Sequence, residues 1–125
     1  MNERSIIGIT GEDIACEYLI DNGYKIIDRN FLRPYGELDI IAKSKDKTLV
    51  FVEVKTIKDS VNLSAEEHLN FSKLQKLRKT GSLYAGANQK LIDDSKGWRI
   101  DLIAITITNL TDYKKDFILK HYQNI

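Results

Sequence analysis

The chain of 125 residues has little of what marks several protein classes: it contains one cysteine, one proline and a formal net charge of only +1. Because Cys16 stands alone, no internal disulfide and no thiolate metal cage can form. With seven glycines and 42% hydrophobic residues, the composition excludes collagen-like, low-complexity and extended disordered chains. The near-zero net charge argues against a protein that coats nucleic acid through a uniformly basic surface.

Long apolar segments are also absent from the sequence. No uninterrupted apolar run approaches the roughly 18 residues of a membrane-spanning helix. The first residues, Met1 to Ser5, do not lead into the apolar stretch of a signal peptide. We therefore expect a cytoplasmic protein without a membrane partner. The length predicts one domain over residues 1–125, without repeats or linkers.

Hydrophobic periodicity predicts two helices and five strands along the chain. The helices span residues 11–21, with Thr10 as the N-cap, and about residues 64–85. The strands span residues 24–31, 38–42, 49–55, 98–108 and 117–122. Polar residues 43–48 have the length of a hairpin connection between the second and third strands. The order αβββαββ predicts a small α/β or α+β layer structure and not a run of βαβ units.

Both strands of the predicted hairpin have an apolar face and a face that becomes charged toward one end. Side-chain alternation defines these faces, since successive residues of a strand point to opposite sides. The apolar faces consist of Leu38, Ile40 and Ala42 and of Val50, Val52 and Val54. The opposite faces carry Glu37 and Asp39 in the earlier strand and Glu53 and Lys55 in the later one.

The hairpin register brings two of these acids together. If the turn is centred on Asp46, positions 39 and 53 are directly opposed, with Cβ atoms about 5 Å apart. Opposed carboxylates are unfavourable unless a positive charge lies between them. Mg²⁺ or Mn²⁺ bound by the oxygens of Asp39 and Glu53 would supply that charge. Lys55 would then lie beside the ion, where it could activate water or stabilise charge on a phosphate.

A simpler interpretation of the same residues stays open. Glu53 and Lys55 could form a surface ion pair at a strand end, worth only a few tenths of a kcal/mol. The metal site explains the joint pattern better, because it accounts for the first acid, the hairpin-length gap and the later acid-x-lysine together.

Glu12 lies near the start of the first predicted helix. The helix dipole favours an acid there and is a sufficient explanation for Glu12 without any function.

Three other polar features favour structural roles. Arg99 and Asp101, two residues apart in a strand, are expected to form a structural ion pair. His68 and His121 are isolated from any ligand-like cluster, which favours a role at the solvent or at the core boundary.

The sequence around the acidic pair resembles a known family. Asp39, 13 intervening residues and then Glu53-Val54-Lys55 resemble the Asp…Glu-x-Lys motif of the restriction-endonuclease-like nuclease superfamily. Residues 36–42 and 50–55 are similar to the YraN family, small bacterial proteins predicted to be endonucleases and similar to archaeal Holliday-junction resolvases. The resemblance covers nearly the whole chain. The same family pattern is matched by residues 11–12, 15, 18–19, 23–24, 30 and 98–101 and by those near 121.

The resemblance implies a restriction-endonuclease-like α/β fold, with a central mixed sheet of about five strands flanked by helices. It also implies metal-dependent hydrolysis of DNA, including branched DNA, with Mg²⁺ or Mn²⁺ as cofactor. Asp39 and Glu53 would be metal ligands, with the Val54 carbonyl as a third. Lys55 would be the catalytic lysine, and Glu12 matches the additional acid of the resolvase-like site. Resolvase-like enzymes act as dimers, but no dimer surface can be read from this sequence.

One departure from the family pattern supports an alternative function. Family members often carry arginine two residues after the lysine, whereas this chain has Ile57, with Lys58 next to it. An arginine contact to phosphate at position 57 is therefore not expected in this chain. The alternative is a non-catalytic nucleic-acid-binding module on a nuclease-like scaffold.

The positive charge of the chain is concentrated in one segment. Residues 68–92 contain no acid and carry five cations, namely Lys73, Lys76, Arg78, Lys79 and Lys90. Lys73, Lys76 and Lys79 recur every three residues and therefore form a stripe along the second predicted helix. Such a stripe can follow a phosphate backbone, so we expect these lysines to contact DNA. An ordinary solvated helix face is the alternative.

Overall fold

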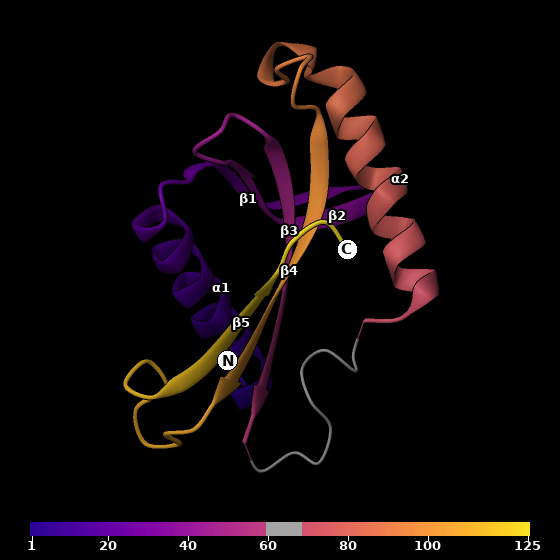
Figure 1. Cartoon of the computed structure of the whole chain (residues 1–125). Coiled ribbons are helices and arrows are strands. Elements are labelled where there is room, and N and C mark those ends of the chain that lie inside the picture. The colour runs from indigo at the N-terminus through magenta and orange to yellow at the C-terminus, as the bar shows by residue number, and fades with distance from the viewer. Residues whose placement is uncertain (60–68) are drawn as a thin grey trace.

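Two helices and five strands form the described part of the chain, residues 1–59 and 69–125, in a computed structural model (Figure 1). In chain order they are α1 (Glu3–Asp21), β1 (Lys25–Arg33), β2 (Gly36–Lys43), β3 (Leu49–Lys58), α2 (Phe71–Ala87), the short 3₁₀ helix η2 (Gln89–Leu91), β4 (Trp98–Ile107) and β5 (Phe117–Tyr122). The predicted order of helices and strands is confirmed. The predicted start of the second helix, residues 64–68, lies outside the described residues.

The strands form one mixed sheet in the order β1-β2-β3-β4-β5. The β3–β4 pair is parallel, and the other three neighbouring pairs are antiparallel. Figure 1 shows α1 and α2 on opposite sides of this sheet. The architecture is α/β and consistent with the restriction-endonuclease-like fold that the sequence predicts. None of the helices among the described residues is both long and apolar enough to cross a membrane.

Each helix packs on the sheet through its own apolar cluster. On the α1 side, Ile14 and Leu19 pack in one cluster with alternate residues of β3, including Val52. On the α2 side, Leu77 and Tyr84 pack in a second cluster with Phe51 and its neighbours. The two sets of β3 side chains alternate, as expected for a strand that is covered on both faces.

Two glycines let the helices approach β3 closely. A Cβ atom added to Gly11 of α1 would lie 1.8 Å from Thr56 Oγ1, and one added to Gly81 of α2 would lie 2.8 Å from the Phe51 ring. Both distances are far inside van der Waals contact, so a larger residue would push the helix away from the sheet. The glycines therefore determine how closely the side chains of α1 and α2 approach the sheet.

The first helix begins eight residues earlier than predicted, at Glu3 instead of residue 11. Its N-cap is Asn2, whose Oδ1 accepts a hydrogen bond from the Ser5 N–H at 2.9 Å. The predicted N-cap, Thr10, was wrong, because this residue lies within the helix and its hydroxyl donates to the Ile6 carbonyl at 2.7 Å. Burial of Ile7 in the α1-side core stabilises a segment whose local helix signal is weak.

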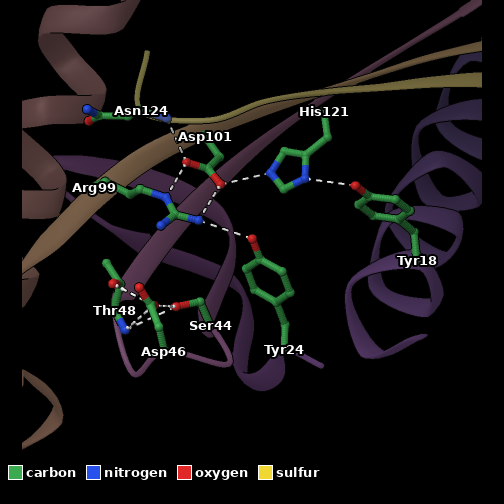
Figure 2. Close-up of polar contacts among 9 residues, drawn as sticks. All are labelled: Tyr18, Tyr24, Ser44, Asp46, Thr48, Arg99, Asp101, His121 and Asn124. Carbon is green, nitrogen blue, oxygen red and sulfur yellow. Dashed lines mark hydrogen bonds and ion pairs between the residues drawn. The ribbon is translucent and has the colours of Figure 1, made fainter. Parts of the chain in front are cut away.

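The register of the β2–β3 hairpin is confirmed. The backbone pairs run from Lys43↔Leu49 to Ile40↔Val52, as a turn centred on Asp46 requires. The Asp46 carboxylate organises this turn by accepting hydrogen bonds from the Thr48 N–H at 3.2 Å and the Thr48 hydroxyl at 2.8 Å (Figure 2).

The predicted face of Leu38 was wrong. Leu38 packs with Phe31 and Ile41 in the α2-side cluster, not with Ile40 on the α1 side. The cause lies in the partner strand, where Asn30 has a φ of 53° between the pairs Arg29↔Ile40 and Phe31↔Leu38. A non-glycine residue in the left-handed region interrupts the regular alternation of a strand pair.

Candidate active site

The two predicted acids meet just beyond the last β2–β3 backbone pair. Asp39 reaches across to β3, where its Oδ2 accepts a hydrogen bond from the Val54 N–H at 2.9 Å. Glu53 lies on the face of β3 that is turned toward α2, and its side chain is only 5% exposed. The two carboxyl groups are close enough to share a hydrogen bond. The fold thus brings Asp39 and Glu53 together, as the hairpin register predicts.

Their proximity has a clear electrostatic consequence. Burial, followed by the hydrogen bond with Glu53 and the charge of Glu53, raises the pKa of Asp39 far above its ordinary value. Burial also raises the pKa of Glu53, but the hydrogen bond from Asp39 and the charge of Lys73 outweigh it, so this pKa lies below its ordinary value. Without a bound cation, the pair therefore holds one proton, which Asp39 donates to Glu53.

Lys73 is part of this cluster. Its Nζ atom lies 3.0 Å from Glu53 Oε2, and one third of its side chain is exposed. Lys73 is in the first turn of α2, where its N–H donates to the N-cap Asn70 Oδ1 at 2.9 Å. Although it is buried, Glu53 Oε2 accepts no hydrogen bond from the described residues, because the ion pair with Lys73 lacks hydrogen-bond geometry.

Lys55 lies beside the same carboxylates. Burial lowers the pKa of Lys55, and its contact with Lys73 lowers it further, whereas the charges of Glu53 and Asp39 oppose this effect. The net direction is downward. A lysine with a lowered pKa gives up a proton more readily than an exposed lysine does.

Val54 presents its backbone to the site. Its N–H points toward Asp39, and within a strand the N–H and C=O of one residue point toward the same neighbour. The Val54 carbonyl therefore points to the same side as the Asp39 carboxylate.

Glu12 and Glu37 lie at the edge of the cluster. Glu12 approaches from α1, lies 3.9 Å from Arg29 Nη2 and has a 20% exposed side chain. Burial raises the pKa of Glu12, while the charge of Arg29 and a hydrogen bond with Asn30 only partly offset this effect. The charge of Glu12 also helps to raise the pKa of Asp39.

Among the described residues, no group of three or more His, Cys, Asp or Glu side chains is arranged to hold a metal ion.

Two cavities adjoin the cluster. One of about 150 Å³ opens toward α2 and is lined by Tyr35, Gly36, Glu37, Glu53, Lys73, Lys76, Leu77 and Thr80. The other, of about 620 Å³, lies between the start of α1 and the end of β3 and is lined by Glu3, Arg4, Ile7, Gly8, Val54, Lys55, Thr56, Ile57 and Lys58. Glu53 and Lys73 therefore border the smaller cavity, whereas Val54 and Lys55 border the larger one.

The predicted lysine stripe is divided in the structure. Lys76 and Lys79 are exposed on α2, whereas Lys73 is turned toward Glu53. This placement of Lys73 was missed, because nothing local in the sequence connects position 73 with position 53. The useful signal is the run of cations within residues 68–92, a segment that contains no acid.

A second polar cluster lies on the α1 face of the sheet and is centred on Asp101 (Figure 2). Asp101 is fully buried and accepts four hydrogen bonds, two from Arg99, one from His121 Nε2 at 2.8 Å and one from the Asn124 N–H. His121 Nδ1 in turn lies 2.9 Å from the Tyr18 hydroxyl. The predicted Arg99–Asp101 ion pair is confirmed, at 2.9 Å.

His121 lies at the boundary of the core, one of the two roles expected for it. Its side chain is only 7% exposed and bridges β5 to β4 and α1, a set of contacts that the sequence did not predict. Because the carboxylate can only accept, His121 donates through Nε2, and in the neutral imidazole Nδ1 then accepts the Tyr18 hydroxyl proton. Burial raises the pKa of Asp101, but the hydrogen bonds from His121 and Arg99 outweigh burial and hold it below its usual range. His68 lies outside the described residues.

Comparison with known proteins places these features in context. The model of "Uncharacterised protein family UPF0102" matches residues 11–105. A UPF0102 protein of Clostridium botulinum is 39% identical over 118 residues, which cover 94% of each chain. A UPF0102 protein of Campylobacter concisus is 38% identical over 104 residues, covering 83% of this chain and 87% of the relative. A third, from Syntrophomonas wolfei, is 37% identical over 101 residues, covering 81% and 84%. The names of these relatives state no activity.

Proposed function

Because the chain belongs to the UPF0102 family, the YraN family of the resemblance described above, we propose that it is a metal-dependent endonuclease acting on DNA. The reaction is hydrolysis of phosphodiester bonds, with branched DNA among the candidate substrates. Family membership alone does not carry this proposal, since the family is described as uncharacterised. The observation that carries it is the buried Asp39–Glu53 pair beside Lys55.

The donor atoms of this pair suit a hard divalent cation. Mg²⁺ prefers carboxylate and carbonyl oxygens and usually takes only one or two protein carboxylates, with water and substrate phosphate completing its shell. Asp39, Glu53 and the Val54 carbonyl offer such a set. Glu53 Oε2 is buried without a hydrogen bond from the described residues and lies 3.0 Å from the Lys73 ammonium, so this oxygen already lies beside a positive charge. These residues therefore fit Mg²⁺ or Mn²⁺.

Each residue has a distinct part in the reaction. Asp39 and Glu53 would hold the ion, which supplies Lewis-acid activation of water and phosphate when bound. Lys55 lies next to this pair, on the same face of β3 as Glu53. It would orient the attacking water and stabilise charge that develops on the phosphate. Glu12, at the edge of the cluster, would tune the site through its charge without being a ligand.

DNA would approach along surfaces that adjoin the site. Lys76 and Lys79 are exposed on α2, and Arg4 lines the cavity that Lys55 borders. These cations would bind backbone phosphates on either side of the cleaved bond.

One observation favours the alternative of a module that binds nucleic acid without cleaving it. Ile57 lines the larger cavity where the family pattern often has arginine, so a phosphate contact is missing at this position. Cleavage assays separate the two functions, because binding without any metal-dependent cleavage would support the alternative.

The test is cleavage of four-way-junction, single-stranded and duplex DNA with Mg²⁺ or Mn²⁺. The wild type is expected to cleave at least one substrate, and Asp39→Asn and Lys55→Ala are expected to reduce its rate by about 100-fold or more. Lys115→Ala, at an exposed loop position, is the matched control and should cleave at the wild-type rate. Cleavage that is unchanged in Asp39→Asn and Lys55→Ala would contradict the proposal.

A further inference from the structure

Lys73 occupies a position in the carboxylate site that a metal ion would also need. Its ammonium lies 3.0 Å from Glu53 Oε2, an oxygen that accepts no hydrogen bond from the described residues. The Glu53 side chain is 5% exposed, so its charge depends on a cation for compensation. In the metal-free protein, Lys73 provides that compensation.

A divalent cation and the ammonium compete for this oxygen. Mg²⁺ binds carboxylate oxygens at about 2.1 Å, so an ammonium held at 3.0 Å from the same atom would be in close repulsive contact with the ion. Lys55 already adds a second positive charge to the cluster. Metal binding is therefore expected to require removal of the Lys73 ammonium from Glu53.

The surroundings of Lys73 permit this movement. One third of its side chain is exposed, and it lines the cavity of about 150 Å³ that opens toward Lys76 and Glu37. Its backbone is held independently, by the hydrogen bond from its N–H to Asn70 Oδ1. The flexible lysine stem can thus swing into the cavity without disturbing the start of α2.

We propose that Lys73 is a built-in competitor of the metal, which neutralises Glu53 in the metal-free protein and is displaced when a divalent cation binds Asp39 and Glu53. The inference rests on the proposed metal-dependent function and adds a regulatory element to the same site. The observed free energy of metal binding is then the free energy of binding to the unoccupied carboxylates less the cost of displacing the Lys73 ammonium from Glu53. At low metal concentration Lys73 stays ion-paired with Glu53, so a higher metal concentration is needed before the divalent cation binds.

The experiment is calorimetric titration of the metal-free full chain with MnCl₂. Lys73→Met keeps the length of the side chain and removes its charge. It is expected to bind Mn²⁺ more tightly than the wild type, within the range of about 5- to 150-fold that is typical of coupled sites. Lys76→Met is the matched control, since Lys76 lines the same cavity but is exposed. Its affinity should stay within about twofold of the wild type because exposed charges are screened.

A second pair of variants shows that the effect acts through Glu53. In a Glu53→Gln background, Lys73→Met should no longer increase the affinity, since the competing ion pair is already absent. Lys73→Gln repeats the main test with a polar side chain in case the methionine variant folds poorly. Thermal unfolding without metal verifies that each variant is folded before titration.

The possible outcomes separate this inference from the proposed function. Tighter binding by Lys73→Met, or binding by this variant alone, supports the competitor role. Wild-type binding that depends on Asp39 but is equal or weaker in Lys73→Met overturns the competitor role and leaves the metal site standing. Absence of binding in both proteins overturns the competitor role together with the metal-dependent function.

Discussion

The two polar clusters of this protein lie on opposite faces of one sheet and satisfy their carboxylates differently. On the α1 face, Asp101 accepts four hydrogen bonds through its two oxygens. On the α2 face, Glu53 Oε2 accepts none from the described part of the chain and lies 3.0 Å from the Lys73 ammonium. A carboxylate whose acceptor sites are all used by the protein stabilises the fold, whereas a buried oxygen without a hydrogen bond retains affinity for a cation.

The pKa directions express the same difference. The hydrogen bonds of Asp101 outweigh burial and lower its pKa, while the pKa of Asp39 is raised by burial and by its neighbour Glu53. The charge of Asp101 therefore stabilises the folded protein, whereas the charge of Asp39 destabilises it.

The largest effect is expected at Asp101. Asp101→Asn leaves the Arg99 guanidinium without its charged partner and replaces an acceptor oxygen by an amide donor. The expected loss is about 3–5 kcal/mol in the free energy of unfolding, measured by urea denaturation. Asp116→Asn, an exposed position, is the control and should change this free energy by less than about 0.5 kcal/mol. A loss at Asp101 as small as that of the control would show that the cluster is not structural.

The next effect concerns the pH dependence of the carboxylate pair. A group whose pKa is raised by folding stabilises the protein while it is protonated and loses this contribution as pH rises through its folded pKa. Because folding raises the pKa of Asp39 to about 9, the folded protein keeps this proton at pH values where the unfolded chain has released it. The metal-free wild type's free energy of unfolding should therefore fall by about 1 kcal/mol or more between about pH 6 and pH 8. In Asp39→Asn this decrease should be absent. Parallel pH profiles of the two proteins, measured by urea denaturation, would contradict the raised pKa.

A smaller effect is expected for the outer part of the Asp101 cluster. Tyr18→Phe removes the hydroxyl that donates to His121 Nδ1 but keeps the aromatic ring packed against the imidazole. The expected loss is about 1 kcal/mol, since a buried acceptor is left without its partner. Thermal or urea unfolding measures it, and Mn²⁺ affinity should be unchanged because the two clusters are on different faces. A change in Mn²⁺ affinity would mean that the clusters are coupled.

The smallest effect is expected at the exposed lysines of α2. Lys79→Ala should weaken DNA binding by a few-fold and reduce the magnitude of the slope of log K against log salt by about 1. Fluorescence anisotropy over a salt series measures both quantities, with Lys115→Ala as the control. An unchanged slope would leave this stripe as an ordinary solvated helix face.

Much of this arrangement could be predicted from local sequence patterns. Alternation in residues 49–55 and the polar connection at 43–48 predict the hairpin, its register and the meeting of Asp39 with Glu53. The face of Leu38 could not be predicted in this way, since it depends on the backbone of Asn30 in a neighbouring strand. The early start of α1 depends on burial of Ile7, a tertiary effect that outweighs local propensity.

The polar partners that were missed are all distant in sequence. Tyr18 and His121 are 103 residues apart, and neither position carries a local signal of the contact. The pairing of Lys73 with Glu53 depends on how α2 docks on the sheet, which Gly81 permits by its close approach to Phe51. Local patterns thus predict the strands and their acids, whereas helix docking decides which cations reach those acids.

The central claim is that the Asp39–Glu53 pair is a cation site, and the most direct measurement is a crystal structure of the protein with Mn²⁺ and anomalous scattering data. The claim predicts an anomalous peak bonded to oxygens of both carboxylates at about 2.2 Å, with the Lys73 ammonium moved away from Glu53. A structure at saturating Mn²⁺ with no peak at this pair, and with Lys73 still bound to Glu53, would contradict it.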